Sequence, residues 1–536
     1  MNALAVLYGG SLTKAAFEKV LFAEPGGEAV CALTTAIQKT ASFPGVTKII
    51  LLVGSDFERR AGDAGFAAGK EAEVRVLSEL NVKTLLRTLA ELSRPFDLLY
   101  FAWADAPFLD RDLAGKVAER HLRYAAEYSY ADGWPYGLAP EILAPSTAGV
   151  LAALAEGDQS PVDREALFQV IRKDINAFDI ETEISPVDLR SYRLSLTADS
   201  RRNLLLLTRF QAASGSVCAA GVERLIVEKP ELLRTLPAFY AIQVSGPCPQ
   251  ACALCPYPRF PWPRGEAVTA RRDFMDPACF EELLDAAAAF SGDAVIDLSL
   301  WGELALHPQK MELIRMVLDR RDALSLIIET SGIGWKQEEL ETLARMVQGG
   351  RPLRPWTAPP GCLSWIVSLD AAKKERYGEA RGPGFEEAVR TAQTLVSLFP
   401  QDAYVQAIRL QGAEDDIETF YRSWKDRGAQ VIIQKYDDFC GFLPKMQAAD
   451  LSPVRRHPCW HLMRDMYIFI DGRVSLCRED FSVLAGITDP GNKFSNVFDE
   501  PLEVIWSRGE ERYREHCAGR YTGICGDCDE YYTFNF

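Results

Sequence analysis

The middle of the chain repeats one pattern, a short β-rich segment followed by an amphipathic helical stretch. The candidate strands are Tyr240–Ser245, Val295–Leu300, Leu324–Thr330, Leu363–Leu369, Tyr404–Arg409 and Val431–Gln434. The stretches between them are Pro277–Ala289, Gln309–Asp322, Glu338–Val347, Phe385–Leu398 and Asp416–Asp426. Because crossovers between parallel strands are right-handed, six such units predict an incomplete (β/α)6 barrel, with its chemistry at the C-terminal ends of the strands.

Further segments flank this barrel, since 536 residues are too many for one core. In residues 1–200, helical stretches separate short apolar runs, which predicts an α/β unit with a mostly parallel sheet and helices on both faces. These runs are Ala3–Tyr8, Lys48–Val53, Val74–Leu77 and Asp97–Trp103. Leucine-rich residues 201–237 predict a helical connector to the barrel, which occupies residues 238–437. Residues 438–536 predict a small cysteine-rich module, with short strands around Met466–Asp471 and a helix around Leu502–Glu515.

The charge and the apolar pattern exclude some classes of partner. A formal net charge of −16 argues against a nucleic-acid partner, because phosphate binding requires a basic face. No apolar run is long enough to span a bilayer, and the apolar start lacks a basic leader, so we expect a cytoplasmic protein without a membrane partner. In a reducing compartment, clustered cysteines among the thirteen present are expected to bind metal or to react rather than to form disulfides.

Three cysteines stand together directly after the first barrel strand. From Val244 the sequence reads V-S-G-P-C-P-Q-A-C-A-L-C-P-Y-P, which contains Cys248, Cys252 and Cys255. Thiolates suit zinc or iron–sulfur clusters, and a three-ligand site leaves one iron of a four-iron cluster open to substrate. The alternative is a zinc site completed by a distant residue.

This loop resembles the signature of the radical S-adenosylmethionine (SAM) superfamily, C-x-x-x-C-x-x-C, although Leu254 stands where that family often has an aromatic residue. The resemblance implies that a 4Fe-4S cluster on these cysteines binds SAM and cleaves it reductively to a 5′-deoxyadenosyl radical. After the second strand, Gly302-Glu303 is similar to the family's glycine–glutamate motif, in which Glu303, our candidate catalytic residue, accepts from the methionine amino group. Further SAM contacts implied by the resemblance are Thr330, Ser331, Ser368 and Asp370. For these four, ordinary capping of the next helix remains an equal alternative.

The last hundred residues contain a second group of cysteines. Its pattern resembles the C-terminal extension called SPASM, or its shortened Twitch form, of radical SAM enzymes. The resemblance implies an auxiliary 4Fe-4S cluster, with a four-cysteine zinc knuckle as the alternative. We expect Cys517 to be spare and Cys440 to be a packing residue. The candidate ligands are Cys459, Cys477, Cys525 and Cys528.

The N-terminal region has a glycine loop after the first strand, A-D-A-P after the strand at Asp97–Trp103, and L-S-L-T-A-D-S near its end. Together these motifs resemble those of nucleotidyltransferases of the cytidylyltransferase type. The resemblance implies a CTP site in which Asp105 and Asp199 hold Mg²⁺. Ala15 stands where an arginine is expected, so a domain that binds but does not catalyse is an equal alternative. The implied nucleotide-binding residues are Gly9, Gly10 and Lys19.

Together these patterns predict a radical SAM enzyme that abstracts hydrogen from a peptide or small-molecule substrate, with electrons from a reductase or ferredoxin. A peptide is preferred, and the domain arrangement resembles the spirochaete-type SPASM (spiro-SPASM) proteins. A bifunctional enzyme of sugar or lipid-headgroup metabolism with active nucleotidyl transfer is the alternative. A metal-stabilised scaffold without catalysis is disfavoured by the open three-cysteine site.

Overall fold

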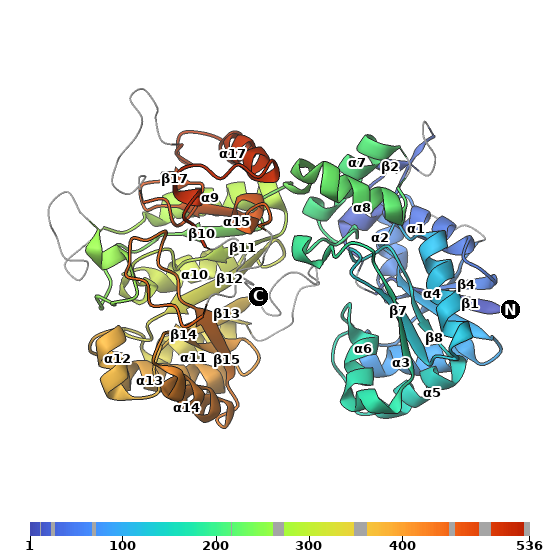
Figure 1. The fold of residues 1–536 in the computed structure, drawn as a ribbon, viewed down its shortest axis with the longest axis horizontal. Helices are drawn as coiled ribbons and strands as arrows, with labels where there is room; N and C mark the ends of the chain where they lie inside the picture. The colour runs from blue at the N-terminus through green and yellow to red at the C-terminus, as the bar shows by residue number, and fades with distance from the viewer. Residues whose placement is uncertain are drawn as a thin grey trace. The chain divides into compact units, whose positions relative to one another are not determined.

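The computed structural model describes residues 1–10, 12–22, 27–66, 71–215, 217–260, 273–347, 362–449, 456–481 and 495–529. Internal contacts divide the chain into a first unit that ends at Leu233 and a second that begins at Arg234 (Figure 1). No helix among the described residues combines the length and the apolarity needed to cross a membrane.

The first unit is built on a seven-stranded, mostly parallel sheet, as predicted, in the order β5-β4-β1-β6-β8-β7-β9. Its sheet strands are β1 (Ala3–Tyr8), β4 (Val46–Val53), β5 (Glu73–Val76), β6 (Leu98–Trp103), β7 (Tyr128–Asp132), β8 (Glu141–Leu143) and β9 (Ile180–Ile184). A separate antiparallel pair is formed by β2 (Leu21–Phe22) and β3 (Ala29–Val30). The helices are α1 (Ala32–Ala41), α2 (Phe57–Asp63), α3 (Val82–Ser93), α4 (Arg111–Arg123), α5 (Pro145–Leu154), α6 (Ala166–Ile171), α7 (Arg201–Ser214) and α8 (Ala219–Glu228).

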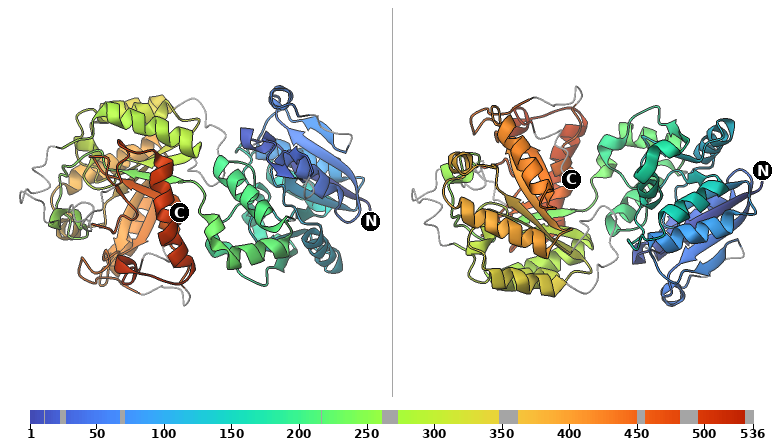
Figure 2. Two further views of the ribbon diagram at one scale, coloured as in Figure 1. Left: turned by 90° about the horizontal axis from the view of Figure 1, so that it is seen from above. Right: turned by 90° about the horizontal axis from the view of Figure 1, so that it is seen from below.

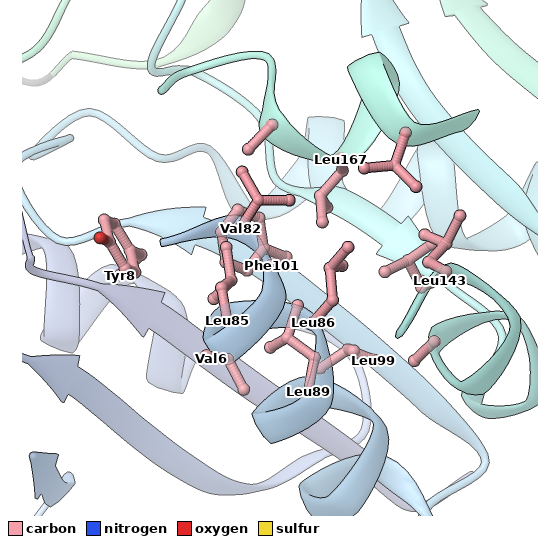
Figure 3. Close-up of a cluster of buried hydrophobic side chains, with 14 of the residues drawn as sticks. Val6, Tyr8, Val82, Leu85, Leu86, Leu89, Leu99, Phe101, Leu143 and Leu167 are labelled. Atoms are coloured by element: carbon pink, nitrogen blue, oxygen red, sulfur yellow. The ribbon is translucent and has the colours of Figure 1, made fainter. Parts of the chain in front are cut away.

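Both faces of this sheet are covered, which explains why its central strands are apolar throughout. All six residues of β1 are buried. On one face Val6 and Phe101 pack against Leu85 and Leu89 of α3 (Figure 3). On the other face the ring of Tyr100 lies 5.3 Å from the ring of Phe43, which follows α1. The predicted connector is helical, and α7 and α8 belong to the first unit.

The second unit contains the predicted barrel strands in parallel, sequential order. They are β10 (Phe239–Ile242), β11 (Ala294–Asp297), β12 (Leu324–Thr330), β13 (Leu363–Ser368), β14 (Ala403–Arg409) and β15 (Gln430–Lys435). The connecting helices are α9 (Pro277–Ser291), α10 (Lys310–Leu318), α11 (Gln337–Val347), α12 (Lys374–Ala380), α13 (Phe385–Leu398) and α14 (Glu414–Lys425). Among the described strands β15 pairs only with β14, so the sheet is an open arc and not a closed barrel (Figure 2).

The C-terminal residues extend this same sheet, an arrangement that the sequence pattern did not predict. The buried strand β16 (Asp465–Ile468) pairs in parallel with β10, and β17 (Val474–Ser475) pairs with β16 in antiparallel. Two helices flank these strands, α15 (Trp460–Arg464) and α17 (Leu502–Cys517). Arg234 joins both helices, since its guanidinium donates to the carbonyl oxygens of Leu462 and Trp506, each at 2.8 Å.

Candidate active site

The three-cysteine loop leaves the C-terminal end of β10 and is braced by α12 and the residues that follow it. The buried Gln250 side chain donates to the Tyr377 hydroxyl at 3.0 Å and to the Pro383 carbonyl oxygen at 3.1 Å. The Ala253 amide donates to the Ala380 carbonyl oxygen at 2.8 Å. These bonds fix the backbone between the cysteines from two sides, so the thiols are presented by an ordered loop.

Burial makes the thiols of this loop reluctant to ionise without a metal. It raises the pKa of Cys248 to about 12, and the negative charge of Glu303 acts in the same direction. Burial also raises the pKa of Cys252 and of Cys255, while the Arg381 guanidinium opposes the shift at Cys252. A bound metal deprotonates coordinating thiols outright, so these side chains suit a metal centre better than a free nucleophile.

The donor set of this loop consists of thiol sulfurs alone. Thiolate is the ligand of iron–sulfur clusters and also a common ligand of zinc. The three cysteines therefore fit the predicted 4Fe-4S cluster as donors.

The turn after β11 packs directly onto the cysteine loop, backbone against backbone. Gly302 has a φ of +75°, and a Cβ atom there would lie 1.8 Å from the Ser245 carbonyl oxygen. The next amide, that of Glu303, donates to the Pro247 carbonyl oxygen at 2.9 Å. Only glycine combines this backbone conformation with this contact, so the predicted glycine–glutamate motif has a structural reason.

The Glu303 carboxylate lies at the centre of a hydrogen-bond network that joins two strand ends. Its Oε1 accepts from the Thr330 hydroxyl at 2.7 Å and from the Ala305 amide at 3.2 Å. Its Oε2 accepts from the amide of Ser331 at 2.8 Å and from the hydroxyl of the same residue at 2.7 Å. Burial raises the pKa of Glu303, and the bonds from Ser331 and Thr330 counteract that effect. The structure thus brings together three of the predicted SAM-contacting residues.

Asp370 forms a second charged group beside the cysteine loop. Its backbone is left-handed, with a φ of +61°, and its carboxylate accepts from the Arg381 guanidinium at 2.7 Å and from the Ile408 amide at 3.0 Å. The Arg381 Nε donates to the Gln250 side-chain oxygen at 3.4 Å. Asp370 therefore reaches the cysteine loop through Arg381, a residue that the sequence reasoning missed because no local pattern marks it.

Ser368 belongs to a neighbouring polar group. Its hydroxyl donates to the Glu329 carboxylate at 2.6 Å, and the Gln406 amide donates to the same oxygen at 2.9 Å. The nearby Asp297 carboxyl is buried, which raises its pKa to about 7. The ends of β11 to β14 therefore present carboxylate, hydroxyl and amide groups.

The C-terminal cysteines lie close enough to interact electrostatically, and one more cysteine joins them. Burial raises the pKa of Cys459 to about 12, with the charges of Cys528 and Cys525 acting in the same direction. Cys477, whose pKa burial also raises, feels the charges of Cys459 and Cys528. Cys440 was expected to be a packing residue, but its thiol forms a hydrogen bond with Cys528 that raises the pKa of Cys440.

Cys517 packs instead among apolar side chains. It lies against the core cluster that contains Cys459, Leu462 and Tyr513.

In the first unit the structure brings Asp105 and Asp199 together, but a buried arginine lies between them. Arg164 contacts both carboxylates, Asp105 at 2.6 Å and Asp199 at 3.4 Å. Lys19 is exposed. Arg164 stands in an ordinary V-D-R-E segment, so the sequence offered no signal for it.

The glycines predicted to cradle phosphate are buried against their own neighbours. A Cβ atom on Gly10 would lie 2.3 Å from the Tyr8 hydroxyl, and one on Gly9 would lie 3.1 Å from the Leu12 side chain. Side chains of the same unit therefore occupy the space beside both glycines.

Comparison with known proteins finds a family match at the C-terminal cysteines and a relative that covers most of the chain. Residues 459–529 match the SPASM family, described as an iron-sulfur cluster-binding domain. An uncharacterized protein of Treponema pallidum (strain Nichols) is 36% identical over 377 residues, which are 69% of this chain and 98% of the treponemal protein. This chain belongs to the family of that treponemal protein. Its cysteines from Cys459 to Cys528 lie within the residues that match the SPASM iron–sulfur domain.

Solved structures with low sequence identity are also similar to parts of the chain. SuiB of Streptococcus suis is 13% identical with a TM-score of 0.40, covering 54% of this chain and 69% of SuiB. A cytidylyltransferase from Leptospira borgpetersenii is 14% identical with a TM-score of 0.33, covering 43% of this chain and 95% of that structure.

Proposed function

We propose that this chain is a radical SAM enzyme whose catalytic 4Fe-4S cluster is held by Cys248, Cys252 and Cys255. One observation carries the proposal: the three-cysteine loop is packed backbone to backbone on the Gly302–Glu303 turn, at the C-terminal ends of parallel strands. When bound, the reduced cluster would supply the electron that cleaves SAM to a 5′-deoxyadenosyl radical, which abstracts hydrogen from the substrate.

Glu303 would bind the ammonium group of SAM, and the hydrogen bonds around its carboxylate determine which bond the ammonium displaces. Each oxygen of its carboxylate already accepts two hydrogen bonds from the chain itself. The Thr330 oxygen is held by the Trp335 indole N–H at 3.0 Å. A hydroxyl can rotate away whereas a backbone amide cannot, so the ammonium would replace the hydroxyl of Ser331, while the Thr330 hydroxyl keeps its bond to the carboxylate. The remaining bonds keep the carboxylate oriented, which limits the reorganisation that binding requires.

Arg381 would support the cluster loop from the other side. Its positive charge favours the thiolate form of Cys252, and its carbonyl oxygen lies 3.9 Å from the sulfur of that residue. The buried ion pair with Asp370 holds the guanidinium in place. We assign Asp370 a positioning role through Arg381, in addition to the SAM contact predicted from sequence.

The auxiliary cluster would be a 4Fe-4S centre on Cys459, Cys477, Cys525 and Cys528. The strand β16 lies between Cys459 and Cys477 in sequence and pairs with β10, which leads into the catalytic loop. One sheet therefore holds both cysteine groups, and relative motion between the two clusters would require breaking a parallel strand pair. This rigidity suits an auxiliary cluster that binds substrate or transfers electrons.

The substrate would lie against the polar strand ends of the open arc. Asp297, Glu329 and Gln406 offer hydrogen-bond acceptors and donors there, which supports a substrate with amide, hydroxyl or amine groups. A peptide satisfies this chemistry and is the preferred class, with a polar small molecule as the other. A reductase or ferredoxin would supply the electron, and the net charge of −16 disfavours nucleic acid. The bifunctional alternative with CTP is not favoured, because Arg164 holds both acidic residues of its expected metal site.

The test is an anaerobic reconstitution followed by iron counting and a 5′-deoxyadenosine assay. Cys252→Ala should abolish 5′-deoxyadenosine formation and lower the iron content by about four, since one of three ligands of a four-iron cluster is lost. Cys279→Ala is the matched control, because Cys279 is a half-buried cysteine of α9 outside both groups. Wild-type 5′-deoxyadenosine formation by Cys252→Ala would exclude the assignment.

A further inference from the structure

The centre between Asp105 and Asp199 in the first unit is occupied by a side chain of the protein itself. Arg164 donates to both oxygens of Asp105, at 2.8 and 2.6 Å, and to Asp199 at 3.4 Å. All three side chains are buried. This geometry is the bidentate pairing for which a guanidinium is suited and an ammonium is not.

Aromatic rings fix the guanidinium from the sides. Its central carbon lies 4.3 Å from the ring centre of Trp103 and 5.4 Å from that of Tyr136. The Tyr136 hydroxyl also takes part in a hydrogen bond with Arg164. The positive charge is therefore held by two carboxylates and two rings.

A divalent cation does not fit this arrangement. Mg²⁺ requires near-octahedral oxygen ligands at about 2.1 Å, several of them usually water molecules. Here the guanidinium takes the inward-facing carboxylate oxygens, and its charge repels a second cation. The neighbouring Gly9 and Gly10 are also packed against Tyr8 and Leu12, so the expected phosphate cradle is filled on its inner side.

The same residues tie the start of α7 to the end of β6. The Asp199 carboxylate accepts from the Asn203 side chain at 2.8 Å, and the neighbouring Ser200 caps the helix by accepting from the Asn203 amide at 3.1 Å. The Ala198 amide donates to the Asp105 carbonyl oxygen at 2.8 Å. Arg164 completes this connection from a third segment, just before α6.

We infer that Arg164 permanently replaces the metal ion at this centre, and that the centre is a structural clamp that fixes the connector helix α7 to the first unit. The first unit is then not a metal-dependent nucleotidyltransferase. Asp105 and Asp199 keep the positions that such an enzyme would need, but their charge stabilises the fold instead of a triphosphate.

Mn²⁺ replaces Mg²⁺ as a spectroscopic probe in the test, on full-length protein prepared in metal-depleted anaerobic buffer. Electron paramagnetic resonance should count the same number of bound Mn²⁺ ions in wild type and in Asp199→Asn, because no ion uses this centre. One additional tight Mn²⁺ in the wild type that Asp199→Asn removes would overturn the inference.

A second measurement uses Arg164→Ala, which leaves two buried carboxylates without their cation. This variant should unfold at a lower temperature than the wild type, and Mn²⁺ should raise that temperature because the ion can now occupy the vacated position. Adding Asp199→Asn to Arg164→Ala should reduce the rise to the size that Mn²⁺ causes in the wild type. An Arg164→Ala protein as stable as the wild type would refute the clamp. If Arg164→Ala is insoluble, Arg164→Lys serves instead, and it should be less stable because an ammonium cannot form the bidentate pair.

Discussion

Replacing Gly302 with alanine is expected to disconnect the glutamate turn from the cysteine loop. The added Cβ would lie 1.8 Å from the Ser245 carbonyl oxygen, which belongs to the backbone and cannot swing aside. The left-handed φ alone costs about 1–2 kcal/mol, and forcing extra volume into a packed contact costs about 1–3 kcal/mol. Loss of the bond from the Glu303 amide to Pro247 adds about 1 kcal/mol. We therefore expect Gly302→Ala to destabilise this contact by about 3–6 kcal/mol.

The matched control is Gly428→Ala. Gly428 has nearly the same φ, +76° against +75° for Gly302, but nothing lies within 4 Å of its added Cβ. The control thus carries the backbone strain without the collision. Equilibrium dialysis of reconstituted protein should show SAM binding weakened at least about 100-fold by Gly302→Ala, with iron lost from the catalytic site, and near-normal binding by Gly428→Ala. Equal SAM affinity in the two variants would refute the reasoning.

Four further expectations concern the paired cysteines Cys525 and Cys528, then Cys440, Thr330 and His121. Replacing Cys525 and Cys528 together should lower the iron content from about eight to about four, whereas stoichiometric zinc in the wild type would favour the knuckle alternative. Cys440→Ala should retain about eight irons, because four SPASM cysteines remain for the auxiliary cluster; loss of four irons would make Cys440 a ligand. Thr330→Val removes a hydroxyl bonded to the carboxylate of the glutamate turn and should weaken SAM binding by about 1–3 kcal/mol, and unchanged affinity in the same dialysis assay would contradict that role. Burial lowers the pKa of His121 from 6.5 to about 4. As the pH drops, the unfolded chain therefore binds a proton at His121 before the folded protein does. The free energy of unfolding should fall between about pH 6.5 and about pH 4. Denaturant titrations should show this loss reduced in His121→Gln, and an identical pH dependence would count against it.

The sequence predicted features that depend on local pattern. The barrel strands were found because each short apolar run is bounded by a polar turn. Gly302 was found through its resemblance to a family motif, and the structure supplies the reason for the glycine, a positive φ with no space for a Cβ atom. Long-range pairing was not predictable in this way. Nothing in Asp465–Ile468 indicates that it pairs with β10, and Arg381 and Arg164 reach their partners only through the tertiary fold. The chemistry of the first unit therefore depends on a residue that the sequence motif does not include.

The pairing of β10 with β16 also sets the order in which the second unit can be completed during synthesis. Phe239 pairs with Asp465, which is 465 − 239 = 226 positions further along the chain. At about 5–20 residues per second, synthesis of that stretch takes roughly 11–45 s. During that time one edge of β10, next to the catalytic cysteines, is an open template for pairing with other chains. Until residue 468 has left the ribosome, β10 is unpaired on one side. Iron delivered during that time would reach a cysteine loop whose supporting strand is not yet fully paired. We expect cluster insertion to follow release of the full chain, and overexpression to yield aggregates when synthesis outpaces folding.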